Sequence, residues 1–428
     1  MKRLAAWLGA ALIALSLADA NGAPAPARAP RARAKATKLA FDGDGPPTFL
    51  VGATLRTGDG RRIENSVIEV RGTRIAAVGG AEARAKIPAG AKVIELAGKT
   101  VTPGLVAADT SLGLVEIDAE TSTRDDAPQL PATVRAAYDA ASAIHADSVL
   151  VPVNAMEGIT SAASTPQGGL VSGQIAWIDL VAGDHDGIVS ARAVAMRAHL
   201  GQSVEGSRAS ALLRLRELFD DARFYRTRKG AFDRNQSREL AAHRLDLDAL
   251  APVLDGRMPL VVSADRVSDL RALVELQKTG VRVVAVGGAQ AWKIGDELAR
   301  AKLPVIVQPS QNLPGSVEDI GARLENAALL AAAGVEVGIA VLGDAHNARN
   351  VTQEAGMAIS YGLDPEVALS AITLVIAKAY GMDAHYGSVA PGKVANLVVW
   401  GGDPFELSQR PQAVWIRGQP IAMRSRQT

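Results

Sequence analysis

Two stretches decide the fold: GKTVTPGLVAADTSLG at residues 98–113 and GSVAPGKVANLVVWGGDP at residues 387–404. In each of them, short apolar segments lie between glycine and proline, the pattern of β-strands bounded by turns. Short alternating segments of the same kind fill residues 48–96, and AVWIRGQPI at residues 413–421 follows the second stretch. The two ends of the chain therefore predict one small β-domain built from both of them.

Between the two stretches, short apolar segments alternate with segments of helical spacing. We expect strands at residues 158–164, 174–181, 258–264, 281–288, 303–309 and 335–344. We expect helices at residues 267–280, 289–301, 316–334 and 350–362. Nearly continuous apolar strands that alternate with helices are typical of a parallel α/β sheet. Residues 185–255 read as largely helical and charged, and we assign no strand there.

The composition excludes several classes of function. The 428 residues are 48% apolar and 21% charged, which is ordinary for a globular protein, and none is cysteine. Disulfides, thiolate metal sites and a cysteine nucleophile are therefore excluded. Residues 1–40 hold seven of the 46 Lys and Arg residues and one of the 45 acids, which leaves 39 bases and 44 acids in the rest. This mildly acidic remainder predicts no nucleic-acid partner.

The N-terminal residues are typical of an export signal. Lys2 and Arg3 precede an apolar run from Leu4 to Leu17, and small residues follow it. This arrangement predicts a secretory signal peptide, because the run is shorter than the roughly 20 residues of a membrane span. The Ala, Pro and Arg composition of residues 21–40 predicts an extended linker. We therefore expect a periplasmic or secreted protein with no membrane span after cleavage; an uncleaved anchor is the alternative.

The two end stretches, together with VLGDAHNARNVTQEAGMAISYGLDPEVALSAITLVIAKAYGM at residues 341–382, resemble the metal-dependent amidohydrolase superfamily. The imidazolonepropionase-like branch is the most similar one. The resemblance implies an α/β fold, a TIM-like (β/α)8 barrel with a small β-sandwich formed by both chain ends. The domains expected are a signal peptide at 1–20, a disordered linker at 21–40, sandwich portions at 41–100 and 387–428, and the barrel at 101–386.

The resemblance also implies one or two divalent metal ions at the carboxyl ends of the barrel strands. Relatives bind them with His-x-His after strand 1, often a carboxylated Lys or a Glu after strand 4, and His after strands 5 and 6. Here the His-x-His positions correspond to Asp109 and Ser111. The later histidines correspond to Ser263 and to Gly287 or Gly288. The family's histidine ligands are therefore missing from this chain.

Asp344, after the last strand, alone matches a functional position with a competent residue. Zinc needs three or four good ligands, so carboxylates and serine hydroxyls are a poor set for it. Asp109 and Asp344 are candidates to hold a hard cation with water and carbonyl oxygens. We expect a site that has lost its metal, and no cofactor is assigned. Asp246 or Asp248, within residues 185–255, could supply a strand-4 ligand.

For several other polar residues, the sequence is compatible with a functional role and with a purely structural one. As a catalytic pair, Asp344 and His346 would orient a water or activate a hydroxyl; alternatively, His346 caps the next helix or faces solvent. Arg266, after strand 5, would bind a substrate carboxylate, or it pairs with a nearby acid. Ser172 and Gln174 lie in a glycine-rich loop that resembles the substrate-side loop of the branch, although glycines in such a loop commonly serve a turn.

Two hypotheses follow. The chain is an exported amidohydrolase-family protein, related to hydrolases of non-peptide or cyclic C–N bonds, with weak or no turnover because its metal site is degenerate. Alternatively, it is a pseudo-enzyme that serves as a binding module or as the partner subunit of an active amidohydrolase. The partners expected are a small-molecule substrate or such a subunit, and a homo-oligomer stays open.

Overall fold

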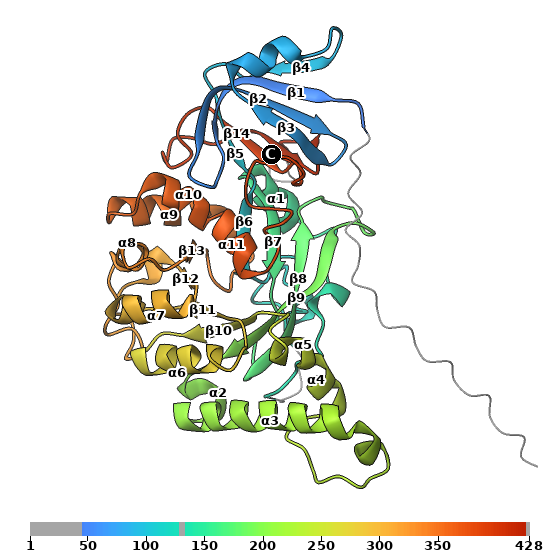
Figure 1. Cartoon of the computed structure of the whole chain (residues 1–428), viewed down its shortest axis with the longest axis vertical. Coiled ribbons are helices and arrows are strands. Elements are labelled where there is room, and N and C mark those ends of the chain that lie inside the picture. Colours follow the sequence, from blue (N-terminus) through green and yellow to red (C-terminus); the bar gives the residue numbers. More distant parts are fainter. Residues whose placement is uncertain (1–44, 128–132, 425–428) are drawn as a thin grey trace, which may run out of the picture. The chain divides into compact units, whose positions relative to one another are not determined.

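The computed structural model describes residues 45–127 and 133–424. The predicted signal peptide and linker lie outside the described residues. Two sheets and a set of helices make up the described part of the chain (Figure 1). Within that part, no helix has both the length and the apolar character needed to cross a bilayer.

The first sheet joins the two ends of the chain. Its strands follow the order β16-β15-β14-β5-β1-β2-β3, and β4 pairs with β1. In Figure 1 the blue strands β1–β3 accordingly lie in the same sheet as the red strand β14. Leu55, Leu397 and Trp415 pack in its core. The strands are β1 (Thr48–Arg56), β2 (Arg62–Arg71), β3 (Arg74–Gly79), β4 (Lys92–Glu95), β5 (Thr100–Pro103), β14 (Leu397–Trp400), β15 (Pro411–Ile416) and β16 (Gln419–Pro420).

The second sheet has eight strands in the order β13-β12-β11-β10-β9-β8-β7-β6. Its neighbouring pairs are parallel except those that β8 makes with β7 and β9, so β8 alone runs in reverse. The sheet curls so that its first and last strands come close together: the N–H of Gly343, after β13, donates to the carbonyl of Asp109 in β6 over 2.7 Å. The strands are β6 (Leu105–Thr110), β7 (Ile159–Ser164), β8 (Val171–Asp179), β9 (Val189–His199), β10 (Leu260–Ala264), β11 (Val283–Gly287), β12 (Val305–Val307) and β13 (Val337–Ile339).

Helices cover the outside of this curled sheet. In α6, Leu270 and Leu273 lie one turn apart and are fully buried, so one face packs inward. The helices are α1 (Leu150–Met156), α2 (Gln202–Glu205), α3 (Arg208–Asp233), α4 (Arg244–Ala249), α5 (Ala251–Leu254), α6 (Val267–Gln277), α7 (Gly295–Ala301), α8 (Asn326–Ala332), α9 (Val351–Ser360), α10 (Pro365–Ala371) and α11 (Leu374–Ala379). The predicted α/β fold, a TIM-like barrel with a second sheet from both chain ends, is confirmed.

Strand β9 lies inside the region to which the sequence analysis assigned no strand. It joins the reversed strand β8 to β10, and its sequence VSARAVAMRAH mixes small, apolar and charged residues. Counted from β6, it is the fourth strand of the barrel sheet. The strand-4 position of the barrel is therefore on β9.

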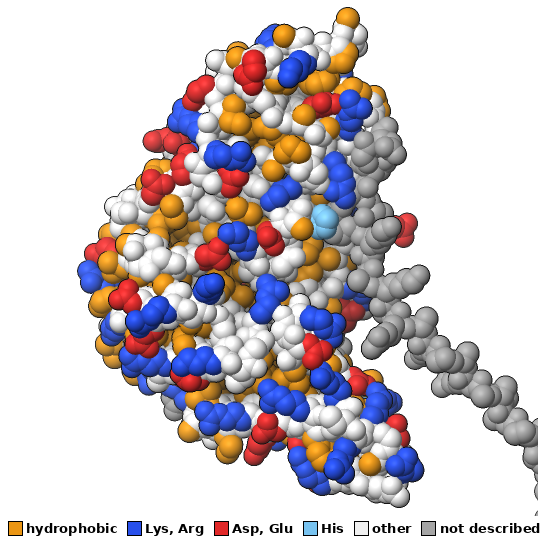
Figure 2. Space-filling model, viewed as in Figure 1, with side chains coloured by type: hydrophobic (Ala, Val, Ile, Leu, Met, Phe, Trp, Pro, Cys, Tyr) orange, Lys and Arg blue, Asp and Glu red, His pale blue; other side chains and the backbone are white. Residues whose placement is uncertain are grey.

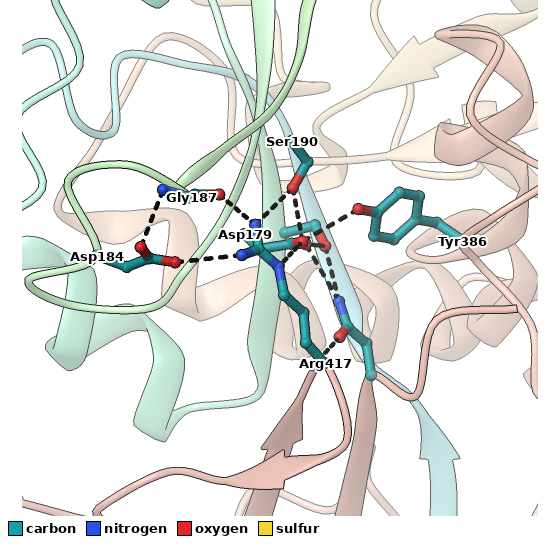
Figure 3. Close-up of polar contacts among 8 residues, drawn as sticks. Asp179, Asp184, Gly187, Ser190, Tyr386 and Arg417 are labelled. Carbon is teal, nitrogen blue, oxygen red and sulfur yellow. Dashed lines mark hydrogen bonds and ion pairs between the residues drawn. The ribbon is translucent and has the colours of Figure 1, made fainter. Parts of the chain in front are cut away.

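A buried polar cluster connects β8 to the loop between β15 and β16 (Figure 3). The fully buried Asp179 carboxylate accepts hydrogen bonds from Ser190 Oγ at 2.7 Å and from Tyr386 Oη at 3.0 Å. Arg417 Nε lies 2.7 Å from the same carboxylate, and its Nη1 is 3.2 Å from Asp184. These contacts hold the sheet of the chain ends against the strands of the barrel.

Candidate functional site

A buried ion pair lies at the carboxyl ends of β6, β9 and β10. Arg197 Nε is 2.8 Å from Asp109 Oδ1, and Arg197 Nη2 donates to Asp109 Oδ2 over 3.0 Å. The same Nη2 donates to Ser263 Oγ over 2.6 Å. Only 2% of the Arg197 side chain and 4% of the Asp109 side chain are exposed. The structure thus brings two of the predicted metal-ligand positions together around a guanidinium group.

The backbone fixes both partners. Asp109 has φ = +47°, in the left-handed region that a non-glycine residue rarely adopts, and the hydrogen bond from Gly343 N–H to its carbonyl supports it. Arg197 Nη1 donates to the carbonyls of Ala198 and Val261, at 2.9 and 3.3 Å. Both terminal nitrogens of the guanidinium are therefore engaged within the protein.

Sequence reasoning missed Arg197 because it did not recognise β9. Arg197 lies on the fourth barrel strand, where the resemblance places a carboxylated lysine or a glutamate. The mixed small, apolar and charged residues of β9 give no clear strand signal from which it could have been found. Asp246 and Asp248, the alternatives named above, lie on α4 instead: Asp246 accepts from Ala137 N–H over 2.9 Å, and Asp248 pairs with Lys229 at 2.8 Å.

The residues present do not fit the metal that the resemblance implies. Asp109 already faces a cation, and Ser111 Oγ donates to the Gly343 carbonyl over 3.5 Å. Gly287 offers no side chain, and a Cβ built there would come within 2.5 Å of Asp265 Oδ1. Among the described residues, no group of three or more His, Cys, Asp or Glu side chains could hold a metal ion.

Two further titratable groups near this ion pair are held neutral. Burial, with a smaller contribution from the Arg197 charge, lowers the pKa of His199 to about 3. Burial, aided by the Asp109 charge, raises the pKa of Tyr380 far above its usual value. His199 Nε2 is buried and has no hydrogen-bond partner among the described residues, whereas the Tyr380 hydroxyl interacts with the backbone of Asp109. A base is most effective when its pKa lies near the working pH, so neither group suits proton transfer.

A cavity of about 670 Å³ opens at the carboxyl ends of β11, β12 and β13, and Asp344 lines it. We call it the mouth cavity. The Asp344 carboxylate accepts from the N–H of Asn347 at 2.9 Å and from its Nδ2 at 2.7 Å. His346 is exposed, and its Nε2 lies 3.0 Å from Arg349 Nη2. Asp344 and His346 thus contact different neighbours, and their role as a catalytic pair stays a prediction.

The three predicted substrate-binding residues make contacts within the protein. Arg266 Nε lies 3.2 Å from Glu318, the acid that pairs with it. Gln174 Nε2 donates to the carbonyl of Ala136 over 3.2 Å. Ser172 is fully buried, and its hydroxyl has no hydrogen-bond partner within residues 45–127 and 133–424. A role for them in substrate binding also stays a prediction.

Comparisons with known proteins agree with the geometry of the fold. A model of the amidohydrolase family matches residues 264–421. An amidohydrolase, tasK, of Hapsidospora irregularis is 38% identical over 72 residues, or 17% of this chain and 7% of its own length. Imidazolonepropionase of Klebsiella pneumoniae is 37% identical over 62 residues, or 14% of this chain and 15% of its own length. The matches thus span a small part of both relatives.

A solved structure is similar over nearly the whole chain. The crystal structure of an amidohydrolase from Thermotoga maritima matches with a TM-score of 0.77 and 23% identity, over 88% of this chain and 100% of the other. At that identity the likeness supports the fold. It leaves the chemistry to be argued from the residues of this chain.

Proposed function

Because this chain belongs to the amidohydrolase superfamily, a group of hydrolases that act on C–N bonds, we propose that it is a non-catalytic member. In this proposal the barrel is a binding module for a small molecule at its mouth. The observation that carries the proposal is the Arg197–Asp109 ion pair, because it puts a fixed cation beside the residue that replaces the first metal-binding histidine.

A guanidinium cannot activate a water molecule for hydrolysis in the way that a metal ion does. A metal in this fold lowers the pKa of a bound water and polarises the scissile carbonyl. A guanidinium stays protonated at all physiological pH values and can only donate hydrogen bonds. In this chain, Asp109, Ser263 and two main-chain carbonyls accept those hydrogen bonds. The geometry therefore supports binding without metal-assisted hydrolysis.

Two further parts of the proposal rest on sequence alone. We propose that the protein is exported to the periplasm or the medium, on the basis of its basic and apolar N-terminal residues. We also propose that the binding module works alone or beside an active amidohydrolase subunit. Figure 2 shows acidic and basic side chains interspersed on the face drawn.

Metal content and turnover test the proposal together. The purified full chain is incubated with zinc, manganese or cobalt, desalted and analysed by mass spectrometry, and then assayed against N-acyl amino acids, dipeptides and cyclic amides. We expect substoichiometric metal and no turnover. Stoichiometric metal with turnover that a chelator abolishes would overturn the proposal. Metal-free turnover that is lost in Asp344→Asn would also overturn it and would assign catalysis to Asp344.

A further inference from the structure

The mouth cavity has an unusual lining. Among the described residues, four carboxylates and five carboxamides line it, and no lysine, arginine or histidine does. The carboxylates are those of Asp265, Asp319, Asp344 and Glu354. Its volume of about 670 Å³ is that of a pocket for a small organic molecule. An acidic lining alone does not identify a ligand. The hydrogen bonds and ion pairs that these carboxylates make show which charges are left for a ligand.

Neutral groups hold the four carboxylates in place. Glu354 is 7% exposed and accepts from Gln308 Nε2 at 3.0 Å, from Ser310 N–H at 2.9 Å and from Ser310 Oγ at 2.6 Å. Asp265 accepts from the Ala289 N–H at 3.2 Å. Asp344 is held by Asn347, as described above, and Asp319 by Ser316 Oγ at 2.7 Å. None of the four has an ion-pair partner among the described residues.

Two arginines close to Asp265 pair with other acids: Arg208, whose charge acts on it, and Arg266, its neighbour in sequence. Arg208 forms ion pairs with Asp269, at 3.0 Å, and with Glu318. Arg266 also pairs with Glu318. Burial raises the pKa of Asp265, and the charges of Asp319 and Asp269 add to this rise despite the opposing charge of Arg208. No ion pair within the described residues therefore neutralises the carboxylates of the cavity.

An independent observation comes from Asn312, which lines the cavity and is only 3% exposed. Its Nδ2 is buried and finds no hydrogen-bond partner in the described part of the chain. The orientation of its carboxamide is set by Asn326, whose Oδ1 accepts from Trp292 N–H and whose Nδ2 donates to the Gly288 carbonyl. Asn326 Nδ2 thus also donates to Asn312 Oδ1, at 3.4 Å, and leaves Asn312 Nδ2 as the free donor. A buried donor without a partner costs free energy, and a ligand acceptor would relieve that cost.

We propose that the mouth cavity binds a small molecule that carries an ammonium group and a neutral oxygen acceptor. The ammonium group would lie among the carboxylates, and the oxygen would accept from Asn312 Nδ2. The acceptor must be neutral, because an anionic oxygen would be repelled by the four carboxylates. This inference names the ligand class of the proposed binding module and rests on that proposed function.

Mono-N-acetylated α,ω-diamines, from ethylenediamine to cadaverine, have both groups at varied spacing and are the probes. Their binding to the full chain is measured by isothermal titration calorimetry. Two controls of matched length accompany each probe: the parent diamine lacks the neutral acceptor, and the N-acetyl ω-amino acid has a carboxylate in place of the ammonium group. We expect at least one acetylated diamine to bind about tenfold more tightly than its parent, and its carboxylate counterpart not to bind.

Variants locate the site. Asp319→Asn with Asp344→Asn removes two of the four charges while it keeps the shape of the side chains. We expect the dissociation constant of the best probe to rise at least about tenfold, because charge-assisted hydrogen bonds are lost. Asp186→Asn changes an exposed aspartate in the β8–β9 turn, at the opposite end of the barrel strands, and should leave binding unchanged. Circular dichroism confirms the fold of each variant.

The outcomes separate the inference from the proposed function. If no acetylated diamine binds, if the carboxylate counterparts bind equally well, or if the double variant binds like Asp186→Asn, the ligand inference is wrong while the non-catalytic proposal stands. If a probe binds as expected and is then hydrolysed to acetate and diamine, the ligand class is right and the non-catalytic proposal is wrong.

Discussion

At the scale of the single residue, Arg197 provides the positive charge of the buried ion pair at the barrel mouth. Its charge meets Asp109 inside the protein, where water does not screen either group. Taking two charges out of water is costly, so such a pair adds little net stability compared with apolar residues. Removing one partner is strongly destabilising, because the other charge is then buried without an opposite charge beside it.

We therefore expect Arg197→Met to lower the free energy of unfolding by about 3–5 kcal/mol, since it leaves the Asp109 carboxylate unpaired. Urea denaturation followed by circular dichroism measures this change. Arg192→Met, on the same strand but with a half-exposed side chain that pairs with Asp139, serves as the control and should cost less than about 1 kcal/mol. Adding Asp109→Asn to Arg197→Met should restore part of the loss; a loss equal to that of the control would contradict the prediction.

His199 makes stability depend on pH. Its pKa is about 3 in the folded protein and 6.5 when unperturbed, so the unfolded chain takes up the proton first as the pH falls. Stability is therefore lost as the pH falls from about 6.5 toward 3, and the loss at pH 5 is about 2 kcal/mol. His199→Gln should remove this part of the acid sensitivity in urea titrations at pH 7.5 and pH 5. His145→Gln, at an exposed position, should behave like the parent, and equal pH dependence in all three proteins would disprove the assignment.

At the scale of elements, the link between the two sheets depends on Arg417. This residue lies between β15 and β16 and reaches the buried Asp179 at the end of β8 (Figure 3). Its backbone has φ = +51°, so the loop is held in a strained conformation that places the guanidinium. The contact joins residues that are 238 positions apart in the sequence.

Arg417→Met should consequently lower the free energy of unfolding by about 3 kcal/mol, because the fully buried Asp179 keeps its neutral donors and loses its cation. Differential scanning calorimetry and urea denaturation both report the change. Arg410→Met is the matched control, since its side chain is 80% exposed and pairs with Glu157 at the surface. Equal effects of the two substitutions would show that the Asp179 cluster does not hold the sheets together.

Elements differ in how well the sequence predicts them. Strands β10 and β11, LVVSA and VVAVG, are buried on both faces and are therefore almost wholly apolar, which the pattern of the sequence reveals. Strand β9 carries Arg192, Arg197 and His199, since one part of it is exposed and another holds the buried ion pair. A charged strand of this kind does not stand out from helix or loop. The barrel and the split sheet could be predicted, whereas β9 could not.

The same reasoning explains what could be predicted of the candidate site. Asp109 and Ser263 follow apolar strands, so their places in the motif revealed the missing histidines. Their partner Arg197 is 88 residues from Asp109, and only the folded sheet brings the two together. The free amide of Asn312 was equally hidden, because it depends on the chain of hydrogen bonds through Asn326.

For the whole molecule, the fold should be independent of metal. The melting temperature of the full chain should be the same after treatment with EDTA as after addition of zinc, because the described residues contain no group of ligands that could hold the ion. Scanning calorimetry in both conditions measures this. A rise on adding zinc that EDTA reverses would reveal a metal site that the folded chain uses for stability, since a ligand that binds the native state raises its melting temperature.

Under the proposed function, a side-chain cation in place of a metal ion also changes what the protein needs from its surroundings. A bound metal has to be acquired, exchanges with its competitors in the order of their affinities, and can be lost to a stronger chelator. A guanidinium is synthesised with the chain and has no competing ion. Under the proposed function, the ion pair at Asp109 therefore needs no metal supply, and we expect it to be the same in metal-starved and metal-rich environments.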